Sequence, residues 1–104
     1  MYQRYLILYH LLDYCYKNNC TDLDLPPFLG EMNPYLWEDY MPMDRTVYDE
    51  WYKKSKTTNN LKQSVIEFLE SYERKYHFDF KETKIILNGL SDKEINDIIA
   101  KIKK

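Results

Sequence analysis

Glycine is scarce in this sequence, with only Gly30 and Gly89 among 104 residues. A phosphate-cradling loop needs closely spaced glycines so that backbone amides can approach the ligand, so nucleotide binding is disfavoured. Sheet proteins need frequent turns rich in glycine, asparagine and proline, yet all four prolines fall between residues 26 and 42. The sequence therefore predicts an all-α protein.

Cysteine and histidine are equally sparse. Cys15 and Cys20 give neither a disulfide framework nor a zinc-binding spacing, so we expect two ordinary reduced thiols. His10 and His77 do not have the spacing that places two ligands on one helical face. We therefore expect no metal and no cofactor. We interpret His10 as a core or partly exposed histidine. We expect His77 at the end of a helix, where the helix dipole favours a cation.

No motif for catalysis is present either. The sequence has neither a Gly-x-Ser-x-Gly nucleophile elbow nor a cysteine-protease signature. Two carboxylate pairs, Glu38-Asp39 and Asp49-Glu50, have no flanking apolar pocket that would raise one pKa for acid catalysis. The sequence predicts a protein that binds rather than an enzyme, and catalysis by these carboxylates remains a third hypothesis.

Long apolar runs are also absent. The most apolar stretch, residues 5–12, is interrupted by His10 and closed by Asp13, and it is shorter than the roughly 18 residues that span a bilayer. No small-residue cleavage site follows it, so we interpret it as an amphipathic helix and not a signal peptide. These features predict a cytoplasmic protein without a membrane partner.

The length and the apolar periodicity predict a single helical domain over residues 1–104. We expect a bundle of about five helices, with a proline-rich irregular segment between the first and second long helices. Asp44 is the expected N-cap of the helix over residues 45–56. Capping boxes at Asp79 with Glu82 and at Ser91 with Glu94 are expected to begin the last two helices. The expected helices cover about residues 2–17, 45–56, 58–77, 79–88 and 91–102.

Apolar residues cover an unusually wide arc of the first predicted helix, so it is the candidate core helix. Its stripe is Tyr2, Tyr5, Leu6, Tyr9, Leu12 and Tyr16, widened by Ile7, Leu8 and Leu11.

Charge is divided unevenly along the chain. Residues 1–50 carry three basic and nine acidic residues, a net charge of −6, whereas residues 51–104 carry +4. Acidic and aromatic residues alternate between positions 31 and 52, a mixture typical of a surface that binds a basic protein and repels nucleic acid. We expect Trp51 to be buried. The predicted partner-binding residues are Glu31, Trp37, Glu38, Asp39, Tyr40, Asp44, Asp49 and Glu50.

The same part of the chain contains four short runs of residues: Phe28-Leu29-Gly30-Glu31-Met32, Trp37-Glu38-Asp39, Pro42-Met43-Asp44 and Val47-Tyr48-Asp49-Glu50-Trp51. Together they resemble a stretch of the small bacterial immunity proteins of contact-dependent growth inhibition systems. The resemblance implies a cytoplasmic protein that binds and neutralises a cognate toxin, often a nuclease whose active-site surface is positively charged.

A second hypothesis explains the same residues. A helical adaptor or regulatory subunit would use this face on a partner that is not a toxin. The sequence also leaves homodimerisation open.

Overall fold

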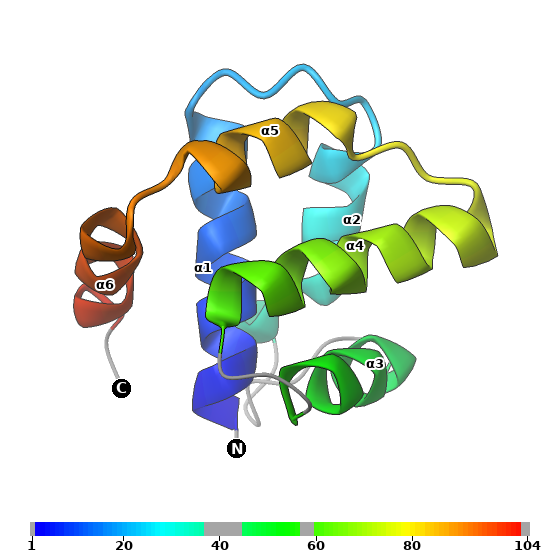
Figure 1. The fold of residues 1–104 in the computed structure, drawn as a ribbon. Coiled ribbons are helices and arrows are strands. Elements are labelled where there is room, and N and C mark those ends of the chain that lie inside the picture. Colours follow the sequence, from blue (N-terminus) through cyan, green and yellow to red (C-terminus); the bar gives the residue numbers. More distant parts are fainter. Residues whose placement is uncertain (1, 37–44, 57–59, 103–104) are drawn as a thin grey trace.

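The computed structural model describes the backbone of residues 2–36, 45–56 and 60–102, and the side chains of residues 5–35, 46–56 and 60–102. All regular structure in these ranges is helical, which confirms the all-α prediction (Figure 1). None of the described helices is long and apolar enough to cross a membrane. The elements are α1 (Tyr2–Lys17), α2 (Leu25–Met32), the 3-10 helix η1 (Pro34–Leu36), α3 (Arg45–Lys56), α4 (Leu61–Tyr76), α5 (Lys81–Gly89) and α6 (Asp92–Ala100).

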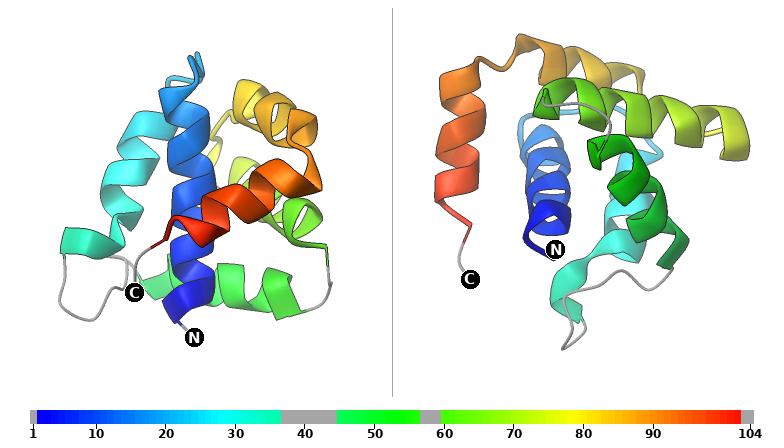
Figure 2. Two further views of the ribbon diagram at one scale, coloured as in Figure 1. Left: turned by 90° about the vertical axis from the view of Figure 1, so that its left-hand side faces the viewer. Right: turned by 60° about the horizontal axis from the view of Figure 1, so that its bottom comes forward.

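Helix α1 is the centre of the structure, as predicted. It contacts α2, α3, α5 and α6, while α4 and α5 run crosswise to it (Figures 1 and 2). Its side chains from Tyr5 to Cys15 supply much of the core, because several of them are completely buried. Tyr16 differs from the predicted stripe and is 49% exposed, since it lies one residue beyond buried Cys15 and turns about 100° away.

Helix α2 was not expected. Pro26 and Pro27 occupy its first turn, where a missing backbone N–H costs nothing and the fixed φ of proline suits a helix. The predicted irregular proline-rich segment is therefore not confirmed, because α2 and η1 occupy residues 25–32 and 34–36. With α2 included, the described residues form six α-helices and not about five.

Phe28 explains how so short a helix is held. Its side chain is 1% exposed, and its ring centroid lies within about 5 to 6 Å of four other aromatic rings, close enough for favourable ring contacts. This cluster fixes α2 against α4 and the start of α5. The four rings are those of Phe68, Tyr72, Phe78 and Phe80.

Helices α3 and α4 lie close to their predicted positions. Asn60 caps α4 by accepting a hydrogen bond at Oδ1 from the Gln63 amide at 3.0 Å. The predicted cap of α3, Asp44, lies outside the described residues. Trp51 is 1% exposed and presents its ring edge-on to Phe68 at 5.9 Å, so its predicted burial is confirmed.

The predicted capping box at the start of α5 is wrong. Helix α5 begins at Lys81, and Asp79 only accepts the Lys81 amide at 3.0 Å. The cap is Asp22, which is about 60 residues away in the sequence: its two carboxylate oxygens accept the amides of Glu82 at 3.1 Å and Thr83 at 2.7 Å. Asp22 also accepts the Thr83 hydroxyl at 2.8 Å. A carboxylate at a helix N-terminus is stabilising, so this tertiary contact replaces the local one.

The second predicted box is confirmed. Helix α5 ends at Gly89, and Leu90 leads directly into the next cap. Ser91 Oγ accepts the Glu94 amide at 3.1 Å, while the Glu94 carboxylate accepts the Ser91 amide at 3.0 Å. This reciprocal pair starts α6.

Candidate partner-binding surface

Three of the eight predicted partner-binding residues lie within the described ranges. Glu31 is exposed near the end of α2, and Asp49 is exposed on α3. Figure 2 shows that η1 and α3, the elements on either side of residues 37–44, lie on the same side of the molecule as the N-terminal end of α1. The other five predicted residues, Trp37, Glu38, Asp39, Tyr40 and Asp44, lie outside the described residues.

Glu50 differs from Glu31 and Asp49, because it already has a partner within the protein. Its Oε1 lies 2.5 Å from Lys75 Nζ, and its side chain is only 19% exposed. The hydrogen bond from Lys75 holds the pKa of Glu50 below its ordinary value, with smaller contributions from Lys53 and Lys54. Glu50 therefore joins α3 to α4, and its carboxylate is less available to a partner than that of Asp49.

Sequence reasoning missed an aromatic cluster beside this surface. Tyr9 and His10 of α1 and Tyr35 of η1 contact one another edge-on, with ring centroids 5.6 to 5.9 Å apart. His10 Nε2 and the Tyr35 hydroxyl are hydrogen-bonded at 2.5 Å, and Tyr35 is 46% exposed. The cluster joins residues 25 positions apart, so no local pattern indicates it. It gives the border of residues 37–44 an exposed ring held in a fixed position.

Partial burial changes the pKa of the His10 imidazole. Burial disfavours the charged form and lowers the pKa of His10 below its ordinary value of 6.5. Asp13 acts in the opposite direction, and Lys17, which is ion-paired with Asp13 at 2.9 Å, adds to the lowering. His10 is therefore mostly neutral at pH 7, and the aromatic cluster carries little positive charge that would repel a basic partner.

Acidification is expected to destabilise the protein through His10. Well above pH 6.5 the imidazole is neutral in both states. As the pH falls, the unfolded chain takes up the proton first, so the free energy of unfolding decreases. The fall ends once the folded imidazole is also protonated. Urea denaturation between about pH 7 and pH 5, above the range in which carboxylates titrate, measures this slope.

The variant His10→Gln isolates the cause of that slope. It should flatten the dependence of the free energy of unfolding on pH, because glutamine does not titrate. An equal slope in wild type and His10→Gln would contradict the assignment.

The two thiols are free, as predicted, and Cys15 does not have the environment of a nucleophile. Cys15 is completely buried, and burial raises its pKa to about 12, with smaller contributions from Cys20 and Asp22. Cys20 Sγ lies 3.3 Å from Thr83 Oγ1. Among the described residues, no group of three or more His, Cys, Asp or Glu side chains could hold a metal ion.

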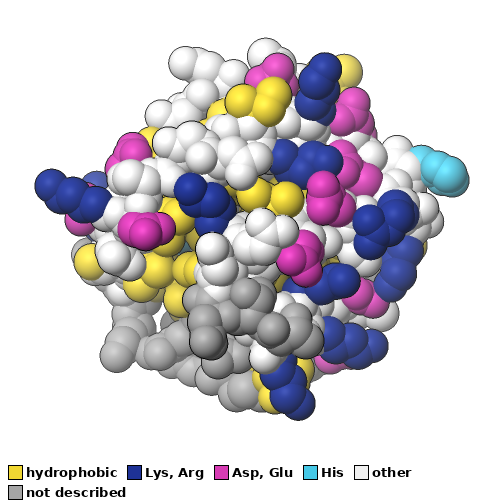
Figure 3. All heavy atoms as spheres, in the orientation of Figure 1, with side chains coloured by type: hydrophobic (Ala, Val, Ile, Leu, Met, Phe, Trp, Pro, Cys, Tyr) yellow, Lys and Arg dark blue, Asp and Glu magenta, His cyan; other side chains and the backbone are white. Residues whose placement is uncertain are grey.

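Charges on the described face of α4 and α5 are mixed. Figure 3 shows Lys and Arg side chains interspersed with Asp and Glu over these helices, without a large area of one sign. This arrangement differs from the long basic stripe of a protein that binds nucleic acid.

Comparison with protein-family models, curated proteins and solved structures gives no match for this chain.

Proposed function

We propose that this protein is an immunity protein that binds and neutralises a cognate bacterial toxin with a basic surface, such as a nuclease. The binding surface includes the segment from Glu31 to Asp49, and neutralisation occurs by covering the toxin and not by chemistry. The observation that carries the proposal is the accumulation of acids and aromatic rings in this segment: exposed Glu31, Tyr35 and Asp49 lie at its two borders. The sequence between these borders, residues 37–44, adds further acids and aromatic residues.

Two physical effects make such a surface suited to its partner. Acidic residues accelerate the encounter with a basic protein, and aromatic rings supply the contact energy once the surfaces meet. The flanking elements are firmly attached to the core, because Met32, Val47 and Trp51 are each at most 3% exposed. A surface whose supports are already ordered loses less entropy on binding.

The acidic part of this proposal predicts the effect of charge reversal. Glu31→Lys and the double variant Glu38→Lys with Asp39→Lys should each slow association with the toxin by about tenfold or more at low salt, with less effect at high salt. Coexpression of this protein with the product of the adjacent gene, followed by a growth-rescue assay, identifies the toxin. Stopped-flow mixing of the two purified proteins then measures the association rate.

Asp97→Lys is the matched control for Glu31→Lys, because Asp97 is an exposed acid on α6 and both reversals change the net charge by the same amount. An association rate that falls equally in Asp97→Lys would indicate a general charge effect and contradict a localised surface. Copurification of a partner without any growth inhibition to rescue would favour the adaptor hypothesis instead.

A further inference from the structure

Tyr35 and Tyr16 are about equally exposed, at 46% and 49%, but their rings are held differently. The Tyr35 ring contacts the rings of Tyr9 and His10 edge-on, at centroid distances of 5.9 and 5.6 Å. Its hydroxyl is hydrogen-bonded to His10 Nε2 at 2.5 Å. Within the described ranges, Tyr16 has no ring contact and no side-chain hydrogen bond. Tyr35 therefore combines an accessible ring with a fixed orientation.

The backbone that carries Tyr35 is also well fixed. Pro34 precedes it in η1 and is buried, and proline has a restricted φ. The Tyr35 amide donates to Asn33 Oδ1 at 2.9 Å. Met32 is completely buried, and its carbonyl accepts the hydroxyl of Tyr5, which joins this backbone to α1. A ring on such a support loses little conformational entropy when it enters an interface.

His10 supplies the polar contact that orients the ring. It is half-buried on α1, directly before the completely buried Leu11. The contact with Tyr9 restrains the Tyr35 ring by packing, whereas the hydrogen bond to His10 also fixes the direction of the phenol group. Loss of the imidazole would remove this hydrogen bond and one ring contact, so the Tyr35 side chain would sample more rotamers.

Tyr35 lies beside the acids of the proposed surface. Glu31, which is exposed, precedes it by four residues, and the acids and aromatic residues of positions 37–44 follow it closely in the sequence. Tyrosine is one of the residues that most often dominate the binding energy of an interface. An ordered tyrosine ring bordered by acids therefore suits the basic partner proposed above.

We propose that Tyr35 is an anchor residue for the partner of this surface and that His10 is the positioning residue that orients it. The identity of the partner rests on the proposed function. The two kinds of residue have different roles: the acids attract the partner, and the Tyr35 ring retains it. Affinity then depends on an imidazole of α1 that acts through Tyr35.

NMR spectroscopy of the free protein tests the positioning role without a partner. Nuclear Overhauser effects between the ring protons of Tyr35 and His10 are expected in the wild type, and the Tyr35 side chain should be more ordered than that of Tyr16. In His10→Leu, the order of the Tyr35 side chain should fall toward that of Tyr16. His10→Gln should retain it, because the glutamine amide can still form a hydrogen bond with the hydroxyl.

The kinetics of toxin binding test the anchor role. Tyr35→Ala should raise the dissociation rate by at least about thirtyfold and change the association rate by less than about twofold. The charge reversal Glu31→Lys should have the opposite pattern, because it slows association. Tyr16→Ala is the matched control, since Tyr16 is equally exposed but lies at the C-terminal end of α1, away from η1 (Figure 2). Its dissociation rate should equal that of the wild type.

A double-variant cycle tests whether His10 acts through Tyr35. His10→Leu alone should weaken toxin binding by about fivefold. In the Tyr35→Ala background the same substitution should change binding by less than about twofold, because no ring remains to be oriented. His10→Gln should bind within about twofold of the wild type. A loss of equal size in both backgrounds would show that His10 acts independently of Tyr35.

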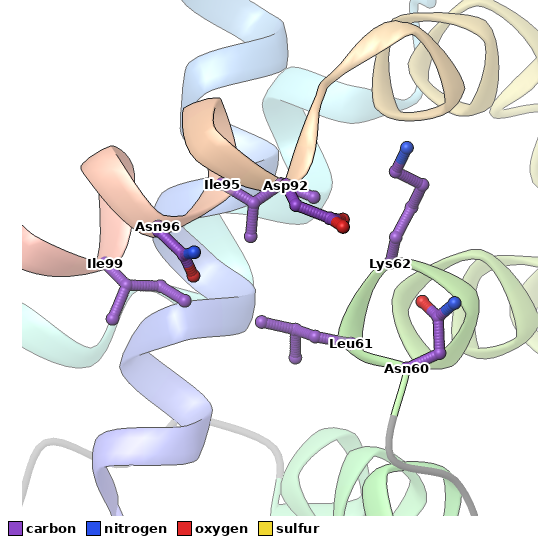
Figure 4. A pocket seen from close by; sticks show the side chains of 7 residues that line it. All are labelled: Asn60, Leu61, Lys62, Asp92, Ile95, Asn96 and Ile99. Carbon is purple, nitrogen blue, oxygen red and sulfur yellow. The ribbon is translucent and has the colours of Figure 1, made fainter.

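The pocket between the start of α4 and α6 provides a second control (Figure 4). It has a volume of about 490 Å³, and neither Tyr35 nor His10 lines it. Asn96 is an exposed lining residue on α6, so Asn96→Tyr fills part of the pocket without changing Tyr35. Toxin binding should be unaffected. A larger loss in Asn96→Tyr than in Tyr35→Ala would place the main contact at the pocket and contradict the proposal.

Two further results would overturn the proposal. They are equal dissociation rates in Tyr35→Ala and Tyr16→Ala, and the absence of Nuclear Overhauser effects between Tyr35 and His10. Neither result affects toxin binding or growth rescue by the wild type, so the proposed function would stand. If the wild type neither binds the product of the adjacent gene nor rescues growth, the proposed function is wrong and the anchor role is wrong with it.

Discussion

Replacing Trp51 with alanine is expected to lower the free energy of unfolding by about 3 to 5 kcal/mol, the usual cost of truncating a buried large aromatic side chain. Trp51 is 1% exposed and contacts Phe68 edge-on, so its removal leaves a cavity between α3 and α4. Urea denaturation followed by far-ultraviolet circular dichroism measures the loss without relying on tryptophan fluorescence.

Tyr52→Ala is the control for this prediction. Tyr52 is half-buried and stacks on Tyr48 at a centroid distance of 6.4 Å, so its truncation should cost about 1 kcal/mol. The loss in free energy of unfolding for Trp51→Phe should lie between those for Tyr52→Ala and Trp51→Ala. Trp51→Phe should also leave toxin binding unchanged, because the ring faces the core. Equal losses in Trp51→Ala and Tyr52→Ala would show that Trp51 does not hold α3 and α4 together.

Replacing Asp22 with alanine is expected to cost about 2 to 3 kcal/mol, more than the usual loss of a helix cap. The carboxylate accepts two amides of α5 and the Thr83 hydroxyl, and Thr83 is completely buried, so its hydroxyl would lose a partner that water cannot readily replace. Urea denaturation gives the total loss, and hydrogen exchange of the α5 amides shows whether the effect is centred there.

Asp24→Ala is the matched control, since Asp24 accepts a single hydrogen bond, from the Asp79 amide at 2.8 Å. It should cost about 1 kcal/mol. Asp22→Asn should be intermediate, because the amide keeps one acceptor oxygen. If Asp22→Ala lowers the free energy of unfolding by no more than Asp24→Ala does, the hydrogen bonds from α5 to Asp22 do not stabilise the protein as argued.

The long helices could be predicted because their signals are local. Apolar spacing places α1, α3 and α4 within about three residues of their observed ends, and the Ser91 with Glu94 box fixes the start of α6. Burial of Trp51 follows from the same spacing, since it lies one turn beyond buried Val47. Where the residues that define a helix lie within it or next to it in the sequence, the sequence is enough to predict that helix.

Helix α2 could not be predicted from the density of prolines, because such a density favours irregular backbone. Proline is compatible with a first helical turn, and Pro26 and Pro27 both lie there. What decides the outcome is Phe28, whose aromatic partners come from residues at least 40 positions later in the chain. Tertiary packing therefore stabilises a helix that local propensity disfavours.

The same limit applies to the candidate site. Glu50 appeared equivalent to Asp49 in the sequence, but its partner Lys75 is 25 residues away, as is Tyr35 from His10. Asp79 looked like a cap because Glu82 follows it at the right spacing, yet Asp22 takes that role from before α2. Contacts between distant residues decide which acids remain available, and a linear pattern does not contain them.

The central position of α1 has a consequence for synthesis of the chain on the ribosome. Two of the helices that contact α1, α5 and α6, leave the exit tunnel after α1, α2, α3 and α4. Until α5 and α6 emerge, the central helix α1 lacks part of its cover, and exposed apolar surface of this kind binds chaperones or other nascent chains. Premature termination before Lys81 would leave α1 without either cover, and the fragment would be a substrate for degradation and not a partly active protein.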